Sequence, residues 1–344
     1  MVLLTVIMTS ELKLDFVTLD VFTSTRFLGN PLAVVFVHSD QKHLLTQATK
    51  QRIAHEFNLS ETVFLHTLPS EPNLSSSTRE IDIFLTNAEI PFAGHPTIGT
   101  AYLILQHLGW THITTLLTKA GPIPVSPVAA ADGEGVSAAV PQAVHTHRHT
   151  LQSFINSPST PSDVKNSTTA GLLPDPETRG AELSAPIVDI VKGMTFGLVR
   201  LPSLEHLARV KATGLELGKV PGLLDWDSFA ARYYFVAVTT GDTAEDGVCE
   251  VRTRNVELGF EDPATGSAAC ALAGWLAVNS DHEQLPSGGQ EERARFRIVQ
   301  GVEMGRRSEI DIEVVTENEG GKKVVREVKL GGKAVVVMNG SIVV

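Results

Sequence analysis

The chain has 344 residues, 42% of them hydrophobic and 19% charged, and its 28 Lys and Arg against 39 Asp and Glu give a net charge of −11. An acidic chain without a dense Lys/Arg block lacks the electrostatic footprint of a protein that binds nucleic acid or an anionic membrane. Its two cysteines exclude a disulfide scaffold and a tetrathiolate metal site. The length favours two domains, and the expected partner is a small molecule or another protein.

The N-terminus gives no signal for export. The apolar run at residues 2–8 lacks a preceding basic region and is followed by Glu11, so we interpret it as a ragged extension and not as a signal peptide. No stretch of the sequence reaches the roughly 20 apolar residues that a membrane-spanning helix needs. We therefore expect a cytoplasmic protein.

The first 120 residues alternate strand and helix signals. Strands are predicted over residues 16–22, 32–37, 62–65 and 81–85. Between them Leu45, Thr49, Ile53 and Phe57 recur every four residues, which predicts one face of a helix. Asn58 follows directly, and asparagine readily adopts the left-handed conformation that ends a helix.

The rest of the chain has mostly strand signals, around residues 187–201, 233–240, 248–254, 295–300, 310–315, 323–330 and 334–338. Many short strands with few crossover helices favour mainly antiparallel sheets, and hence an α+β fold. Residues 152–182 are rich in Ser, Pro and Asp, and we interpret them as a solvated loop or polar insertion.

Two predicted helices, over residues 95–105 and 262–276, are apolar on every side and must therefore be surrounded by protein. In each, a polar residue precedes a proline, as expected of an N-cap followed by the first helical position. His95 aligns with Asp262 at an offset of 262 − 95 = 167, and Gly99 with Gly266 at the same offset. This repeat predicts two similar domains, each with strands wrapped around one central buried helix.

The starts of these helices are candidate anion sites, because a helix N-terminus offers free N–H groups and a partial positive charge. Small residues let a ligand approach the backbone, namely Gly94 and Gly99 in one helix and Gly266 and Ser267 in the other. If the two starts face each other across a cleft, they would hold a carboxylated substrate from both sides. Tight helix–sheet packing is the alternative explanation for glycines at these positions.

Five motifs occur in order: Asp20-Val21-Phe22-Thr23 with Gly29-Asn30-Pro31, Asn58-Leu59-Ser60-Glu61-Thr62, Gly94-His95-Pro96-Thr97, Glu261-Asp262-Pro263-Ala264-Thr265-Gly266-Ser267, and Gly331-Gly332-Lys333-Ala334-Val335. Together they resemble the PhzF family of phenazine-biosynthesis-like isomerases, from about residue 16 to 344. The resemblance implies a diaminopimelate-epimerase-like fold with two pseudo-symmetric domains, residues 12–120 with 333–344 and residues 121–332. It also implies an active site in the cleft between them, no cofactor, no metal, and often a homodimer.

The resemblance further implies roles for single residues. Glu61 matches the glutamate that moves a proton between carbons of a small carboxylated substrate. Substrate contacts and proton-transfer support fall to His95, Asp262 and Ser267. The positions that would border the bound substrate are Asn30, Ser60, Gly94, Pro96, Thr97, Thr265, Gly266 and Ala268.

The residue chemistry agrees with these roles but leaves alternatives open. A glutamate can act as base and then as acid when a partly apolar site raises its pKa toward neutrality, and Phe57, Val63 and Phe64 could supply such a site. Glu61 could instead be exposed at a helix–strand junction, and His95 and Asp262 could serve only as N-caps. An amino-acid racemase or epimerase, or a catalytically silent binding protein of the same fold, are the alternative functions.

Several residues depart from the expected patterns. Diaminopimelate epimerase has a cysteine just before its first helix where this chain has Ala93, so a two-cysteine mechanism is not expected. Arg254 stands where an aromatic residue is expected before the Asp-Pro motif. Cys249 and Cys270 fit inert core positions. The alternating histidines at 145, 147 and 149 could suggest a metal, but no companion cysteine or carboxylate cluster accompanies them, so a solvated strand or loop is favoured.

Overall fold

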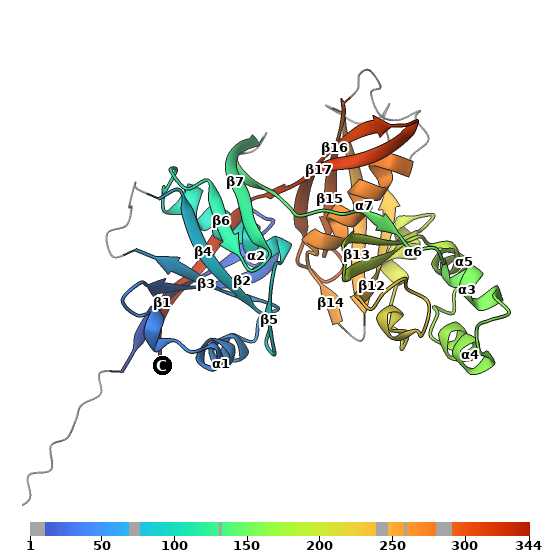
Figure 1. Cartoon of the computed structure of the whole chain (residues 1–344), viewed down its shortest axis with the longest axis horizontal. Coiled ribbons are helices and arrows are strands. Elements are labelled where there is room, and N and C mark those ends of the chain that lie inside the picture. Colours follow the sequence, from blue (N-terminus) through green and yellow to red (C-terminus); the bar gives the residue numbers. More distant parts are fainter. Residues whose placement is uncertain (1–10, 69–75, 131–132, 239–246, 258–259, 280–290) are drawn as a thin grey trace, which may run out of the picture.

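The computed structural model describes residues 11–68, 76–130, 133–238, 247–257, 260–279 and 291–344, so most of the N-terminal extension lies outside the described residues. Figure 1 shows two lobes, each with a helix among strands. The first lobe holds the N-terminal strands and the last strand of the chain, and the second holds most of the remainder. Within the described residues, no helix has the length and apolar character needed to cross a membrane.

The strands of the first lobe form one twisted sheet whose neighbours are mostly antiparallel. The pairs β2–β3 and β4–β6 are parallel. In spatial order the strands are β18 (Ala334–Val343), β1 (Lys13–Val21), β2 (Asn30–His38), β3 (Thr62–Thr67) and β4 (Thr78–Phe84), which borders both β5 (Glu89–Ile90) and β6 (Thr115–Thr118), and then β7 (Gly121–Ala130). The C-terminal strand therefore returns to pair with the first one.

The helix predicted between β2 and β3 is α1 (Gln47–Phe57), preceded by the short 3-10 helix η1 (Lys42–Leu44). Its N-cap is Thr46, whose side chain accepts a hydrogen bond from the Thr49 N–H. Asn58 ends the helix with φ = 51°, which confirms the left-handed terminator. A helix between two parallel strands is the usual crossover connection, so α1 brings the residue before β3 to the sheet edge where β2 begins.

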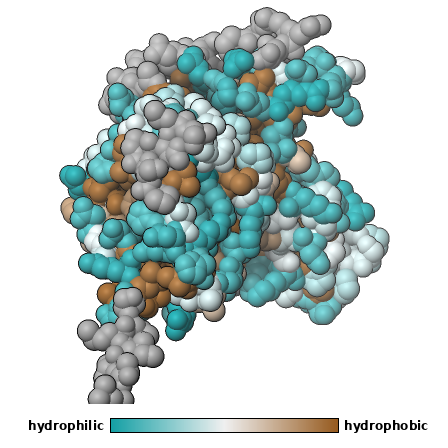
Figure 2. Space-filling view, turned by 60° about the vertical axis from the view of Figure 1, so that its left-hand side comes forward, coloured by the Kyte–Doolittle hydropathy of each residue, from teal (hydrophilic) through white to brown (hydrophobic). Residues whose placement is uncertain are grey.

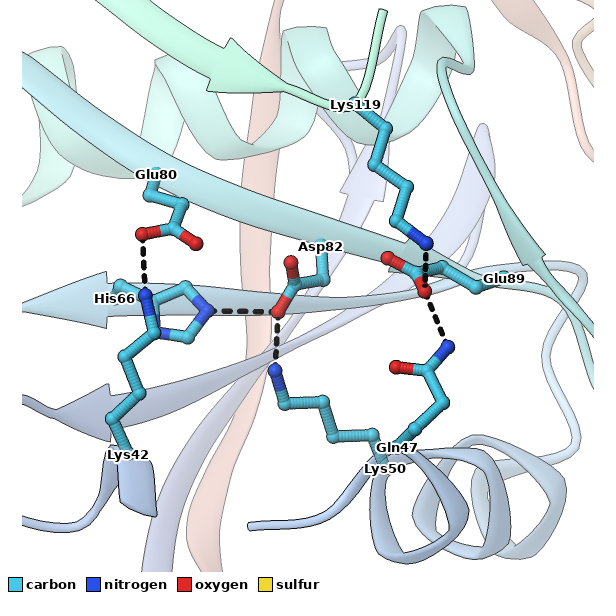
Figure 3. A network of polar contacts seen from close by, with 8 residues as sticks. All are labelled: Lys42, Gln47, Lys50, His66, Glu80, Asp82, Glu89 and Lys119. Atoms are coloured by element: carbon cyan, nitrogen blue, oxygen red, sulfur yellow. Dashed lines mark hydrogen bonds and ion pairs between the residues drawn. The ribbon is translucent and has the colours of Figure 1, made fainter.

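Polar contacts fix α1 and η1 on the sheet, as Figure 3 shows. Asp82 of β4 accepts hydrogen bonds from Lys50 of α1 at 2.5 Å and from His66 of β3 at 2.8 Å. Burial raises the pKa of Asp82, but the hydrogen bonds and positive charge of His66 and Lys50 outweigh it and lower the pKa to about 2. Lys42 forms an ion pair with Glu80 at 2.6 Å. Glu89 accepts a hydrogen bond from Gln47 and forms an ion pair with Lys119.

The second lobe is a larger sheet, again mainly antiparallel, with β11–β12 and β13–β15 as parallel pairs. In spatial order its strands are β9 (His145–Thr146), β10 (Ile187–Val191), β11 (Met194–Arg200), β12 (Phe229–Ala237), β13 (Val248–Glu257), β15 (Glu291–Gln300), β16 (Ser308–Glu319), β17 (Lys322–Gly332) and β8 (Gly133–Ala139), with β14 (Phe260–Asp262) beside β13. Strand β8 also pairs with β7, which joins the two lobes. The predicted α+β class is confirmed. The end of the strand expected over 233–240 falls partly outside the described residues.

Both predicted buried helices exist. In the first lobe, α2 (Gly94–Tyr102) continues as a turn of π-helix, η2 (Leu103–His107), and packs on β1, β2 and β3. In the second lobe, α7 (Gly266–Asn279) packs on β10, β16 and β17. Gly109 has φ = 69°, in agreement with a helix closing near it. These helices form the centre of the main hydrophobic core, because neither has a polar face.

The predicted starts of these helices were wrong by one to four residues. The N-cap of α2 is Ala93, without a side-chain cap, so His95 and Pro96 lie inside the first turn. The second helix begins at Gly266, after Asp262 and Pro263. Pro96 fits inside the first turn of α2, because the N–H groups there have no partner within the helix, whereas Pro263 lies in the turn before α7. The Pro motif therefore does not fix the cap position to the residue before it.

The polar segment at 152–182 is not a loop, and that part of the prediction was wrong. It folds into α3 (Leu151–Asn156), α4 (Ser162–Ala170) and α5 (Pro176–Ser184). Glu182 of α5 is fully buried and forms an ion pair with Arg232 of β12 at 2.8 Å. A buried charge must be paired, so this contact ties the segment to the second sheet. The remaining helices are α6 (Leu204–Arg209) and the 3-10 turn η3 (Leu217–Lys219).

The face of the molecule shown in Figure 2 is mainly hydrophilic, with hydrophobic side chains in small separate patches. Large side chains that are exposed singly include Phe27, Phe229, Phe260 and Met338. Scattered exposed apolar residues are normal on a folded protein.

Candidate active site

The starts of α2 and α7 touch each other at two glycines. A Cβ atom added to Gly94 would lie 3.2 Å from the Cα of Gly266, and one added to Gly266 would lie 3.3 Å from the Cα of Gly94. Both would also press on Leu330. This contact explains Gly94 and Gly266 by close backbone approach, and it brings the two helix N-termini together.

Asn30, at the start of β2, links the two lobes beside this contact. Its Nδ2 donates hydrogen bonds to Asp262 Oδ1 and to the carbonyl of Ala264, both at 3.0 Å, and lies 3.5 Å from His95 Nδ1. The residue is 1% exposed. Asn30 therefore joins two predicted site residues from different lobes, although its amide is already engaged by the protein.

Glu61 lies between α1 and β3, with its side chain 15% exposed. Its Oε2 is 3.6 Å from Nδ1 of His95. Among the described residues, this buried oxygen has no hydrogen-bond partner. Burial raises the pKa of Glu61 to about 7, against a smaller opposite effect of a hydrogen bond from Ser60. The alternative of a solvent-exposed junction residue does not hold, since the carboxyl group is largely shielded from water.

His95 is buried in the first turn of α2. Burial lowers its pKa to about 4, while the charge of Asp262 and a hydrogen bond to the backbone of Pro31 act in the opposite direction. The imidazole is therefore neutral at pH 7. Its Nε2 is buried and finds no partner in the part of the chain that the structure describes. Buried polar atoms are normally hydrogen-bonded, so this nitrogen and Glu61 Oε2 are both exceptions among the described residues.

Asp262 ends β14 and lies opposite His95. Burial raises its pKa to about 6, a hydrogen bond from Thr265 lowers it, and the negative charge of Glu61 raises it further. Thr265 Oγ1 donates to Oδ2 at 2.7 Å, and the Ala264 N–H donates to Oδ1 at 3.3 Å. Asp262 therefore organises the turn that leads into α7 and is not the helix N-cap that the sequence predicted.

Gln300, the last residue of β15, was missed by the sequence reasoning. Its Nε2 donates to the carbonyl of Asp262 at 2.8 Å and to Thr265 Oγ1 at 3.0 Å. Its Oε1 accepts hydrogen bonds from the Thr265 N–H at 3.2 Å and from the Tyr233 hydroxyl at 2.8 Å. A signal existed, because residues 294, 296 and 298 face the core and position 300 continues this alternation with a polar side chain.

The other predicted site residues divide into two groups. Ser267 lines a small apolar pocket with Gly94, Gly266, Phe92 and Met194, among others. A second group is buried away from it: the Thr97 hydroxyl donates to the carbonyl of Ala93 at 2.8 Å within its own helix, and Pro96 and Ala268 are buried.

Arg254, which stands where an aromatic residue was expected, has a definite structural role. Its guanidinium forms two hydrogen bonds of 2.8 Å with Glu261 and also reaches carbonyls at the end of α6, among them that of Leu207 at 2.9 Å. A two-point Arg–carboxylate pair is geometrically specific. Since Glu261 precedes Asp262, this pair fixes the strand that carries the aspartate.

A second arginine holds the loop between β1 and β2. Arg306 donates to Asp20 Oδ1 at 2.6 Å and to the carbonyls of Gly29 at 2.8 Å and Leu28 at 3.0 Å. Arg306 belongs to the turn between β15 and β16 in the second lobe. Because Asn30 follows Gly29 directly, this contact places Asn30 relative to Asp262.

The histidine series lies in the second lobe. His147 is buried, its Nε2 is 3.0 Å from Asp189 Oδ1, and its Nδ1 accepts a hydrogen bond from the Asp225 N–H at 3.0 Å. Ligand-type atoms of His145, His147 and Asp225 lie within 4.8 Å of one another, as do those of His66, Glu80 and Asp82. Hydrogen bonds already occupy both nitrogens of His147, which explains its position without a metal ion. His149 stacks edge-on against Phe154.

The cysteines lie apart from this chemistry. Cys270 is buried inside α7, where burial raises the pKa of its thiol, so an inert core residue is the fitting description. Cys249 lies in β13 and is half-buried.

The chain is similar to known proteins over nearly its whole length. The family model described as phenazine biosynthesis-like protein, PhzC-PhzF, matches residues 19–340. An uncharacterised isomerase of Mesorhizobium japonicum is 31% identical, over 95% of this chain and 98% of the relative. Trans-2,3-dihydro-3-hydroxyanthranilate isomerase of Pseudomonas aeruginosa is also 31% identical, over 85% of this chain and 87% of the relative.

Solved structures show the same fold. A PhzF-family phenazine biosynthesis protein of Bacillus anthracis has a TM-score of 0.69 at 22% identity, covering 97% of this chain and 100% of that one. A probable proline racemase of Agrobacterium radiobacter has a TM-score of 0.52 at 13% identity, covering 96% and 92%. The central buried helices, the Glu61 and His95 pair and the Asp262 turn occur in a chain that belongs to the phenazine biosynthesis-like PhzF family.

Proposed function

We propose that the protein is a cofactor-independent isomerase that moves a proton between carbons of a small carboxylate-bearing metabolite, with Glu61 as the general acid and base. The observation that carries this proposal is the pair of buried, unpartnered atoms, Glu61 Oε2 and His95 Nε2, within the described residues. An empty hydrogen-bonding position costs free energy unless a ligand fills it. The substrate would bind in a cleft between the two lobes.

The pKa of Glu61 suits both halves of a proton relocation. With a pKa raised to about 7, its carboxylate can take a proton from one carbon, and the resulting carboxylic acid can return it to another. A group with the ordinary pKa of glutamate would hold the proton too weakly to act efficiently as an acid at neutral pH. Ser60 would assist by hydrogen bonding to the ionised form.

The converging helix starts support the choice of a carboxylated substrate. Free N–H groups in the first turns of α2 and α7 and the partial positive charge there favour an anion. The same groups, with neutral His95, would stabilise the negative charge that develops when a C–H bond breaks. Ser267, which lines the small pocket beside Gly266, would supply a hydroxyl to the substrate.

The test is solvent-deuterium incorporation into trans-2,3-dihydro-3-hydroxyanthranilate, the compound named for the Pseudomonas relatives, followed by mass spectrometry. Glu61→Gln should lower exchange about 1,000-fold, within the range for removal of a general base, while binding changes little. The matched control is Glu56→Gln, because Glu56 is exposed on α1. Equal exchange in the wild type and Glu61→Gln would refute the role of Glu61.

The same assay separates the alternative functions when a panel of small cyclic acids and amino acids is included. Inversion at a single carbon without relocation of a double bond would indicate a racemase or epimerase. Tight binding with neither exchange nor product would indicate a binding protein of this fold.

A further inference from the structure

The Thr265 hydroxyl lies at the centre of a buried network behind Asp262. Three side-chain atoms surround it: Gln300 Nε2 at 3.0 Å, Asn255 Nδ2 at 2.9 Å and Asp262 Oδ2 at 2.7 Å. A hydroxyl has one proton to donate and two lone pairs that accept. The direction of each hydrogen bond therefore decides which neighbour receives the proton.

The orientation of the Gln300 amide follows from its backbone partners. Its Oε1 faces the N–H of Thr265, which can only donate, and its Nε2 faces the carbonyl of Asp262, which can only accept. If the amide oxygen and nitrogen were exchanged, two donors would face each other at the Thr265 N–H and two acceptors at the Asp262 carbonyl. Nε2 is thus the atom facing Thr265 Oγ1, and it can only donate to it.

The Thr265 hydroxyl oxygen accepts hydrogen bonds from Gln300 Nε2 and Asn255 Nδ2, which use both of its lone pairs. Its own proton is therefore donated to Asp262 Oδ2. The other oxygen, Oδ1, also accepts hydrogen bonds, from Asn30 Nδ2 and from the Ala264 N–H. Both oxygens of Asp262 therefore face donors, and hydrogen bonding to a carboxylate favours its ionised form.

We propose that Gln300 is a positioning residue that makes the Thr265 hydroxyl donate to Asp262, and thereby keeps Asp262 as the fixed carboxylate beside the proton-carrying Glu61. The role of Glu61 rests on the proposed function, whereas the state of Asp262 does not. The two acids then differ in function because they differ in partners: Asp262 is fully supplied with donors, and Glu61 Oε2 has none among the described residues.

Direct titration of Asp262 tests this arrangement without any need for turnover. In the full-length protein labelled with ¹³Cγ-aspartate, the Asp262 carboxyl signal is identified by its absence from Asp262→Asn and followed by NMR against pH. Thr265→Val removes the donor and should raise the midpoint by about one pH unit, and Thr265→Ser should restore the wild-type value. The ionisable groups facing Asp262 are Glu61, His95 and Tyr233, and these variants leave all three unchanged.

Gln300→Met is the variant that tests the directing role, because it removes the donor without adding charge. We expect it to raise the Asp262 midpoint in the same direction as Thr265→Val, by about half a pH unit, because the Thr265 proton is then free to turn away. Gln51→Met, on the distant helix α1, is the matched control and should leave the midpoint unchanged. If Thr265→Val raises the midpoint and folded Gln300→Met does not, Gln300 does not direct the hydroxyl.

Two further outcomes are decisive. An Asp262 midpoint that is the same in the wild type and Thr265→Val would overturn the whole network as the support of Asp262. Should Gln300→Met fail to fold, Asn255→Ala, which frees the other lone pair of Thr265, must raise the midpoint. An Asp262 midpoint in Asn255→Ala equal to that of the wild type would also overturn the proposal. Loss of Glu61-dependent exchange has no bearing on these midpoints, so the proposed function can fail independently.

Discussion

The segments at the starts of α2 and α7, which align in the sequence at His95 and Asp262, are built in opposite ways. At α2, two buried polar atoms, Glu61 Oε2 and His95 Nε2, have no partner within the described residues. At α7, the Asp262 carboxylate and the Thr265 hydroxyl have partners from Asn30, Asn255 and Gln300. Within the described residues, polar atoms at one start lack protein partners, and those at the other are held by the protein itself.

This difference shows how a duplicated element can divide its tasks. A buried polar group without a partner lowers the stability of a fold. A saturated network raises rigidity and holds groups in one geometry. The glycine contact between Gly94 and Gly266 brings the two helix starts together.

The largest expected effect comes from the saturated side. Gln300→Leu leaves Tyr233 Oη, the Thr265 N–H and the Asp262 carbonyl without this partner, and each buried polar group left unpaired costs about 1–3 kcal/mol. The free energy of unfolding should fall by about 4 kcal/mol in urea titrations. Gln51→Leu, which loses one half-buried hydrogen bond to the Leu85 carbonyl, should cost less than about 1 kcal/mol. If both variants lost the same free energy of unfolding, the partners of Gln300 would contribute no more stability than a single half-buried hydrogen bond.

At Glu61, where the partner is missing, substitution should raise the free energy of unfolding instead of lowering it. Because the pKa of Glu61 is about 7 in the folded protein against 4.5 for an unperturbed glutamate, the folded state binds this proton more tightly, and its stability falls as pH rises from 4.5 to 7. Glu61→Gln cannot lose this proton. Its advantage over the wild type should grow from near zero below pH 4.5 to at most about 3 kcal/mol above pH 7. Urea unfolding at pH 5 and pH 8 measures it.

The exposed Glu56→Gln variant is the control for this pH dependence, and its difference from the wild type should stay constant. A Glu61→Gln variant less stable than the wild type at pH 8 would show that the carboxylate is a stabilising group and not an unsatisfied one.

The smallest expected effect concerns the contact that places Asn30 between the two starts. Arg306→Gln loses the partly buried pair with Asp20 and hydrogen bonds to the loop before Asn30, which should cost about 2 kcal/mol in the same unfolding assay. Arg307→Gln is the matched control in the same turn, because its pair with Glu309 is exposed and should contribute about 0.5 kcal/mol or less. If the two variants had the same free energy of unfolding, the side chain of Arg306 would not fix the loop before Asn30.

Much of the fold could be predicted, because it follows from local patterns. The four-residue period from Leu45 to Phe57 gave a helix, and Asn58 gave its end. The two all-apolar segments gave central buried helices, and the many short strands gave a mainly antiparallel α+β architecture. The polar segment at 152–182 was wrongly predicted as a loop, since the burial of Glu182 depends on Arg232, which lies 50 residues away in the sequence.

The sequence by itself determined the family, the duplicated helices and the identity of Glu61, His95 and Asp262 as candidates, because these rest on residue types at fixed local spacings. Tertiary structure alone decided which acid is partnered and which is not. Asn30 and Gln300 donate hydrogen bonds to Asp262, from which they are separated by 232 and 38 residues in the sequence. Arg306 donates to Asp20, which lies 286 residues away. Such long-range hydrogen bonds leave no periodic trace, and they fix the environment that raises the pKa of a buried carboxyl group.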